Sequence, residues 1–154
     1  MSNSNQIFID SSILVEFKKH SKPELLLRLL SMPDLELVIN PIVLSEYTFY
    51  LLAIQGEKSP RSVKESQEIK KILSQDRPEA FLSIFKVLSN GNEIIPKYLE
   101  LMGTYNLLPN DALILATCKL HGIRKLATFD VTDFTRACSA ENIQLIQRVS
   151  DLKV

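Results

Sequence analysis

Short apolar runs recur along the chain, most of them followed by a polar side chain, and they alternate with longer stretches of helical periodicity. A short continuous apolar run is typical of a strand that is buried on both faces, as in a parallel sheet. This pattern predicts strands at residues 6–10, 35–39, 125–129 and 143–147, with 93–95 as a candidate fifth. Because helical stretches separate the runs, we predict a three-layer α/β fold with a central parallel sheet of four or five short strands flanked by helices.

The predicted helices begin at residue types that favour a helix N-terminus, chiefly serine and proline. Ser11 and Ser12 are placed to cap a helix that continues through Phe17. The other predicted helices run from Pro23, from Pro41 to Gly56, from Ser59 to about Ser74, from Pro78 to about Asn90 (one helix or a pair), from Lys97 to Thr104, from Pro109 to His121 and, as a short turn, from Asp133 to Ala137.

The composition narrows the class of protein. The 154 residues fit one domain spanning 1–154, and 45% apolar with 23% charged residues is ordinary for a folded chain. A formal net charge of zero gives no global attraction to nucleic acid or membrane, so any such contact must come from a local patch. No signal-like leader and no apolar stretch long enough to span a bilayer is present, so we expect no membrane association. Two widely spaced cysteines, Cys118 and Cys138, suit packing in a reducing cytoplasm.

Residues 57–77 are the one unusual stretch, with six basic and four acidic side chains. Charges at helical spacing predict a solvated helix with ion pairs along its surface. A second interpretation is a protruding basic arm that contacts a phosphate backbone or a partner.

Acidic residues stand at the ends of apolar runs. Asp10 ends the first predicted strand, Asp130 ends the strand at 125–129, and Asp133 follows three residues later, on the same side of a helical turn. In parallel sheets, ligands bind beyond the carboxyl ends of the strands. Each residue also has a structural alternative, because Asp10 could cap the next helix and Asp130 could begin a turn.

Two further carboxylates belong to predicted helices. The neighbours of Glu46 at helical spacing, among them Ile42, Phe49 and Tyr50, are apolar or amphipathic, so Glu46 is predicted to interrupt a buried stripe. A salt bridge to a lysine is the alternative. Asp111 opens a helix that is apolar on nearly every side, where an acidic residue can satisfy the free N–H groups and the helix dipole of the first turn. Alternatively, Asn110 is the cap and Asp111 faces elsewhere, toward the shared edge of the sheet.

A carboxylate in an apolar setting is costly unless it is paired or bound to a metal. Acidic residues from four distant segments therefore suggest one shared pocket, and Mg²⁺ or Mn²⁺ is the simplest cation to fill it, because both prefer oxygen ligands.

Four segments carry a family resemblance. They are Ile7-Phe8-Ile9-Asp10-Ser11-Ser12, Asn40-Pro41-Ile42-Val43-Leu44-Ser45-Glu46, Asn110-Asp111-Ala112-Leu113-Ile114-Leu115-Ala116-Thr117 and Thr128-Phe129-Asp130-Val131-Thr132-Asp133-Phe134. In order and spacing the chain resembles PIN-domain proteins, the metal-dependent ribonucleases that include the VapC toxins of toxin–antitoxin pairs.

The resemblance implies a catalytic quartet of Asp10, Glu46, Asp111 and Asp130 that holds one or two Mg²⁺ or Mn²⁺ ions. Asp133 would be an accessory metal ligand, and Ser11 or Thr128 a polar helper. It further implies an RNA substrate, a small antitoxin partner and a homodimer.

Three alternatives compete with the ribonuclease. A phosphatase of the haloacid dehalogenase type would need a second aspartate where Ser12 stands. A catalytically silent PIN-like module would bind RNA or protein, and a purely structural role would pair the acids in salt bridges. Neither His20 nor His121 is needed for the chemistry. The candidate basic rim for RNA is Lys18, Lys19, Lys22, Arg124, Lys125 and Arg136.

Overall fold

The structure, a computed structural model, describes residues 5–152 and contains one five-stranded sheet with all pairings parallel. The strand order is β3-β2-β1-β4-β5, which confirms the predicted parallel α/β architecture. The strands are β1 (Gln6–Ile9), β2 (Glu36–Ile39), β3 (Lys86–Val87), β4 (Lys125–Ala127) and β5 (Gln144–Ile146). No helix in this described part of the chain is both long and apolar enough to cross a membrane.

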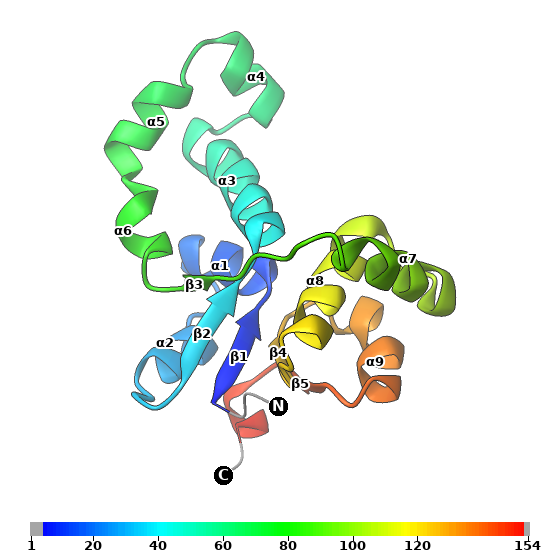
Figure 1. Cartoon of the computed structure of the whole chain (residues 1–154). Coiled ribbons are helices and arrows are strands. Elements are labelled where there is room, and N and C mark those ends of the chain that lie inside the picture. The colour runs from blue at the N-terminus through cyan, green and yellow to red at the C-terminus, as the bar shows by residue number, and fades with distance from the viewer. Residues whose placement is uncertain (1–4, 153–154) are drawn as a thin grey trace.

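Helices cover both faces of the sheet (Figure 1). From β1 the chain moves outward through β2 to β3, and from β4 it moves outward in the opposite direction to β5. Right-handed crossovers in opposite directions place their helices on opposite faces. The helices are α1 (Ser11–Lys18), α2 (Glu24–Leu30), α3 (Pro41–Gly56), α4 (Pro60–Glu65), α5 (Ile69–Asp76), α6 (Pro78–Leu82), α7 (Ile94–Tyr105), α8 (Pro109–Leu120) and α9 (Val131–Ala140), followed by the 3₁₀ turn η1 (Val149–Asp151).

The direction of the connections reverses between β1 and β4. In open α/β sheets, ligands bind at such a switch point, just beyond the carboxyl ends of the strands, and we call this region the crevice. The registers Phe8↔Leu126 and Ile9↔Ala127 bring the residues that follow both strands side by side.

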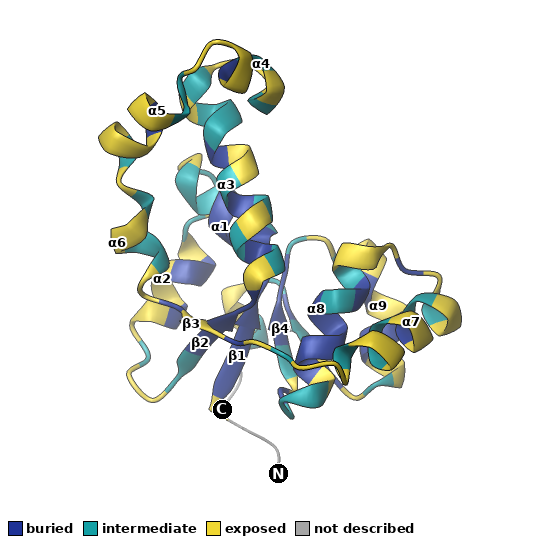
Figure 2. Ribbon diagram, turned by 45° about the horizontal axis from the view of Figure 1, so that its top comes forward, coloured by how far each residue is buried: buried dark blue, intermediate teal, exposed yellow. Residues whose placement is uncertain are grey.

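The core lies between the sheet and its helices (Figure 2). Ile7, Phe8 and Ile9 of β1 are fully buried, and α8 is buried along most of its length. Phe134 of α9 is also fully buried, and it anchors in the core the turn that carries Asp130 and Asp133. The continuous apolar character of β1 and α8 follows from this position, because both elements contact protein on all sides.

Helices α3 to α6 form an arm that projects beyond the sheet, and its outer surface is largely exposed (Figures 1 and 2). Ion pairs Arg61–Glu65 and Lys58–Glu68 lie on the arm, and Lys18 of α1 pairs with Asp76 at the end of α5. The segment 57–77 thus protrudes and its charges are partly paired, whereas contact with a phosphate backbone or a partner stays a prediction.

Several predicted elements need correction. Residues 59–74 form two helices, because Gln67 adopts a left-handed conformation (φ 57°) that no continuous helix permits. The helix predicted from Pro78 to Asn90 stops at Leu82 and gives way to the edge strand β3, whose two residues are exposed and so lack an apolar signature. Residues 93–95 are not a strand but the start of α7.

Two predicted caps are also wrong. Asp10, not Ser11 or Ser12, occupies the N-cap of α1, and its side chain does not cap because two hydroxyl groups hold it elsewhere. Leu108, not Asn110, is the N-cap of α8, with Pro109 at the first position. The turn predicted at 133–137 is the longer helix α9.

Candidate functional site: an acidic crevice at the sheet switch point

Asp10 is the most buried acid of the crevice between β1 and β4. Its side chain is 3% exposed, and its backbone N–H donates to the carbonyl of Ala127 (2.9 Å). Two hydroxyl groups, Ser12 Oγ (2.7 Å) and Thr128 Oγ1 (2.8 Å), donate to the same carboxylate oxygen, Oδ2. Burial raises the pKa of Asp10, the two hydroxyl bonds oppose that rise, and the nearby Glu46 charge adds to it.

Glu46 reaches the crevice from the first half of α3. Its Oε1 accepts a hydrogen bond from Ser11 Oγ (3.0 Å), and its Oε2 accepts one from Asn110 Nδ2 (3.3 Å). Glu46 is half-buried, and its neighbours Phe49 and Tyr50 are 56% and 49% exposed. The prediction that Glu46 interrupts a buried stripe was therefore wrong, because the buried side of α3 is formed by Val43, Tyr47 and Leu51.

Asp111 stands in the first turn of α8 and is half-buried. Its pKa is raised to about 6, first by burial and then by the charges of four other carboxylates: Asp10, Asp133, Glu46 and Asp130. Asp111 is thus within electrostatic reach of every acid that the sequence singled out. A position in a first helical turn alone would favour the charged form, so the raised pKa reflects burial first and the neighbouring acids second, not the helix.

Asp130 and Asp133 form the exposed side of the site. Asp130 is the N-cap residue of α9, and its backbone N–H donates to Thr128 Oγ1 (2.9 Å). Burial raises the pKa of Asp130, followed by the charges of Asp10, Asp133 and Glu16. Asp133 lies one turn further along and is exposed.

Five carboxylates from four segments therefore share one region, and none forms an ion pair with a lysine, arginine or histidine of the described chain. Among residues 5–152, the side chains that donate hydrogen bonds to these acids are all neutral hydroxyl or amide groups. This excludes the salt-bridge alternative for the cluster. It also leaves several negative charges uncompensated, which a bound cation would relieve.

The donor chemistry fits Mg²⁺ or Mn²⁺, because every candidate ligand is a carboxylate oxygen. In the part of the chain that the structure describes, no three acidic, histidine or cysteine side chains are arranged so that one metal ion could contact all of them directly. Mg²⁺ commonly keeps several waters and contacts only one or two carboxylates, so an open cluster suits a hydrated cation.

Sequence reasoning missed three groups that position the site. Ser12 holds Asp10, Asn110 holds Glu46, and Thr117 Oγ1 accepts bonds from Asn40 Nδ2 (2.9 Å) and Asn90 Nδ2 (3.1 Å). The last arrangement ties the start of α3 to the middle of α8, which carry Glu46 and Asp111 respectively. Only Ser12, two residues after Asp10, had a local signal in the sequence.

Most residues of the predicted basic rim either contact other side chains or lie away from the crevice. Lys18 pairs with Asp76, Lys19 pairs with Glu16 (3.9 Å), and the Arg136 guanidinium lies 5.9 Å from the Tyr105 ring centroid. Arg124 and Lys125 stand at the amino end of β4, the opposite edge of the sheet. Lys22 lies near the crevice, with its ammonium 5.1 Å from the centroid of the Phe129 ring, two residues after β4.

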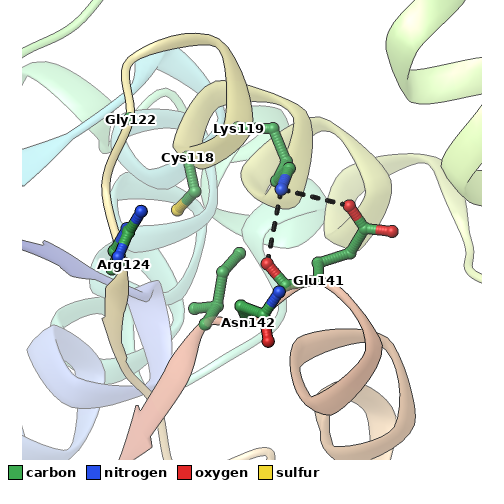
Figure 3. Close-up of a pocket in the computed structure, with 7 residues that line it drawn as sticks. Cys118, Lys119, Gly122, Arg124, Glu141 and Asn142 are labelled. Atoms are coloured by element: carbon green, nitrogen blue, oxygen red, sulfur yellow. Dashed lines mark hydrogen bonds and ion pairs between the residues drawn. The ribbon is translucent and has the colours of Figure 1, made fainter. Parts of the chain in front are cut away.

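A cavity of about 460 Å³ lies at that opposite edge (Figure 3). Lys119 spans it to Glu141, contacting the carboxylate Oε1 (3.3 Å) and the backbone carbonyl (3.3 Å). The C-termini of α8 and α9 end here, where partial negative charge favours cations. Lys119 therefore binds the C-terminal end of α9. None of the five acids lines this cavity. Cys118 and Cys138 are free and buried, in line with their predicted packing role.

Comparisons with known proteins identify the family of this chain and match its fold. The model of the PIN domain family matches residues 7–139. Ribonuclease VapC2 of Methanocaldococcus jannaschii is 37% identical over 143 residues, covering 92% of this chain and 95% of that protein. Ribonuclease VapC6 of the same organism is 36% identical over 154 residues, covering 94% and 99%.

Solved structures give the same fold. A toxin–antitoxin complex from Klebsiella pneumoniae aligns with a TM-score of 0.62 at 20% identity, covering 96% of this chain and 99% of that one. DNA-bound VapBC from Salmonella typhimurium aligns with a TM-score of 0.64 at 15% identity, covering 92% and 96%.

Proposed function

The chain belongs to the PIN-domain family, and we propose that it is a divalent-metal-dependent endoribonuclease, the toxin of a toxin–antitoxin pair. The observation that carries the proposal is the group of five acids, Asp10, Glu46, Asp111, Asp130 and Asp133, at the switch point with no cationic partner. The 36–37% identical relatives are named as ribonucleases, which supports RNA as the substrate.

The residues that would hold Mg²⁺ or Mn²⁺ are Asp10, Glu46, Asp111 and Asp130, with Asp133 as an accessory ligand. A divalent cation bound there supplies Lewis-acid activation of water and neutralises charge on a phosphodiester.

The protein's own groups prepare this site. Ser12 and Thr128 both bind Oδ2 of Asp10, so neither hydroxyl occupies Oδ1. Ser11 of α1 and Asn110 of α8 each bind one carboxylate oxygen of Glu46. Such hydroxyl and amide contacts orient ligand carboxylates and set their basicity. Asp111, with a pKa of about 6, can hold or release a proton close to neutral pH in the metal-free protein.

The proposal is tested by incubating single-stranded RNA with the wild type and with Asp10→Asn, in Mg²⁺, in Mn²⁺ and in chelator. Wild type should cut only with metal, and Asp10→Asn should lose at least about a hundredfold in rate while keeping its circular dichroism spectrum. Asp34→Asn, an exposed aspartate before β2, is the matched control and should cut normally.

Metal-independent cutting would contradict the metal role. Intact RNA under every condition would instead favour the catalytically silent RNA- or protein-binding module.

We also propose a small antitoxin partner and a homodimer. Solved neighbours of this fold are toxins crystallised with antitoxins, which supports the first. Exposed apolar side chains on α7, Ile95 (51%) and Leu99 (51%), support a self-association surface. Light scattering of the purified chain should give twice the monomer mass, and Leu99→Glu should restore the monomer mass. A wild-type monomer across the accessible concentration range would contradict the dimer.

A further inference from the structure

A second hollow opens beside the acidic crevice, at the carboxyl ends of β4 and β5. It has a volume of about 320 Å³, within the range of small-ligand sites. Phe129 forms part of its wall, and this residue lies between Thr128, which holds Asp10, and Asp130. Gln147 and Arg148, the first residues after β5, form another part. The hollow and the crevice therefore share one strand end.

The hollow has the opposite charge to the crevice. Two cations, Lys22 and Arg148, line it against one carboxylate, Glu24. Neither cation forms an ion pair within residues 5–152. A phosphate-bearing chain that enters the crevice meets five carboxylates, so cations beside that entry lower the cost of its approach.

The Lys22 ammonium has a defined position. Its backbone is in the left-handed region (φ 48°), and the ammonium lies over the Phe129 ring, 5.1 Å from the centroid. Attraction between the cation and the ring face holds it there. The backbone of Phe129 is positioned in turn, because its N–H donates to Ser12 Oγ (3.0 Å), and Ser12 also binds Asp10. One serine thus links the cation of the hollow to Asp10 of the crevice.

Backbone hydrogen bonds also hold the part of the hollow that follows β5. The N–H groups of Gln147 and Arg148 both donate to Asp151 Oδ2 (2.8 and 3.1 Å). The Gln147 side-chain amide makes no hydrogen bond within the described chain. Leu25 and Val149 add apolar surface. Cations, an unused amide and apolar surface together match the phosphate, base edge and base face of a nucleotide.

We propose that this hollow is a nucleotide subsite for single-stranded RNA, in which Lys22 and Arg148 bind a phosphate that flanks the scissile one and Gln147 contacts the base. Phe129 is a positioning residue, because it holds the Lys22 ammonium. The proposal rests on the proposed ribonuclease function and names residues that orient its substrate.

The test measures binding of a short fluorescein-labelled single-stranded RNA by anisotropy across a salt series, in the Asp10→Asn background with Mg²⁺ present. Lys22→Gln and Arg148→Gln should each weaken binding and reduce the slope of log Kd against log salt by about 0.7, and together by about twice that. Lys22→Arg and Arg148→Lys should restore the slope, because charge is kept. Arg124→Gln, an equally exposed arginine at the opposite edge, is the matched control and should leave the slope unchanged.

Slopes for Lys22→Gln and Arg148→Gln that equal that of Arg124→Gln overturn the subsite. Cleavage of the same RNA by otherwise wild-type protein, measured in parallel, separates the two proposals. Cleavage with unchanged slopes rejects the subsite but keeps the ribonuclease. RNA that is neither bound nor cut rejects both proposals. Reduced slopes without cleavage keep the binding subsite and reject the nuclease.

Gln147→Ala provides an independent arm. It should alter which nucleotides flank the cut sites in a long RNA while leaving the salt slope unchanged, because it removes a hydrogen-bonding group but no charge. An unaltered cleavage pattern overturns the base contact.

Discussion

At the scale of single residues, Asp111 links the cluster to the pH dependence of stability. Its folded-state pKa of about 6 lies above its ordinary value of 3.8. An acid whose pKa is higher in the folded than in the unfolded state contributes to the free energy of unfolding. This contribution is complete below the unfolded-state pKa and is lost as pH rises through the folded-state pKa. The metal-free protein should therefore lose stability as pH rises from about 4 to about 6, relative to a variant without this group.

Melting temperatures in chelator, measured for wild type and Asp111→Asn across that range, check this prediction. The melting temperature of the variant should rise relative to that of the wild type as pH increases. Asp10 and Asp130 also have raised pKa values, so part of the wild-type loss should persist in the variant. Parallel curves for the two proteins would rule out a raised pKa at Asp111.

Thr128 is a second residue with a separable role. Its buried hydroxyl donates to Asp10 Oδ2 and accepts from the Asp130 N–H. Thr128→Val keeps the shape and removes both bonds, so we expect a loss of roughly 1–3 kcal/mol in unfolding free energy and about 10–100-fold in cleavage rate. Thr104→Val, at an exposed position of α7, should change neither. Normal cleavage by Thr128→Val would show that the hydroxyl does not support the site.

The sequence predicted the acids better than their surroundings. Asp10 and Asp130 were recognisable because each follows an apolar strand. Glu46 was selected for a reason that the structure contradicts, since Phe49 and Tyr50 are exposed. The contacts Ser11–Glu46 and Asn110–Glu46 join residues 35 and 64 positions apart. No local pattern encodes such pairs, because they depend on how α1, α3 and α8 meet.

At the scale of elements, the arm formed by α3 to α6 depends on a few contacts with the body. Phe81 of α6 stacks on Phe17 of α1 (centroids 5.7 Å apart) and packs against Tyr47 (5.6 Å) and Phe85 (5.6 Å). Gly56 ends α3 where a Cβ would meet Val63 Cγ2 at 2.5 Å, so α3 and α4 approach closely only because this residue has no side chain.

Phe81→Ala should loosen the contact between α6, the last helix of the arm, and the body of the protein. Phe81 is half-buried, so we expect a loss of about 2 kcal/mol, below the 3–5 kcal/mol of a fully buried phenylalanine. Limited trypsin digestion should then cut faster between residues 57 and 77. Phe49→Ala, which truncates a 56% exposed ring, is the control and should stay within about 0.5 kcal/mol of wild type. Unchanged digestion of Phe81→Ala would mean that this aromatic cluster does not hold the arm.

Element prediction succeeded where burial imposes periodicity and failed where it does not. The helix from Pro109 and the strand at 6–10 were found because nearly all their residues face the core. The edge strand β3 was missed because its two residues are exposed. The break between α4 and α5 was missed because Gln67, a residue type without turn preference, adopts the left-handed conformation.

At the scale of the whole molecule, the strand order places the chemistry. An order of β3-β2-β1-β4-β5 puts the reversal between β1 and β4, and this brings residues 10 and 130 together across 120 positions of sequence. The apolar runs predicted a parallel sheet but carried no information on strand order. Order follows from crossover handedness and packing, which act only in three dimensions.

The central claim is that these acids form one cation site. The most direct measurement is a calorimetric titration of Mn²⁺ into the wild type and into the double variant Asp10→Asn/Asp111→Asn. Wild type should give saturable heat that the double variant lacks, while both keep the same circular dichroism spectrum. Equal heats for the two proteins, or no heat from a folded wild type, would contradict the account.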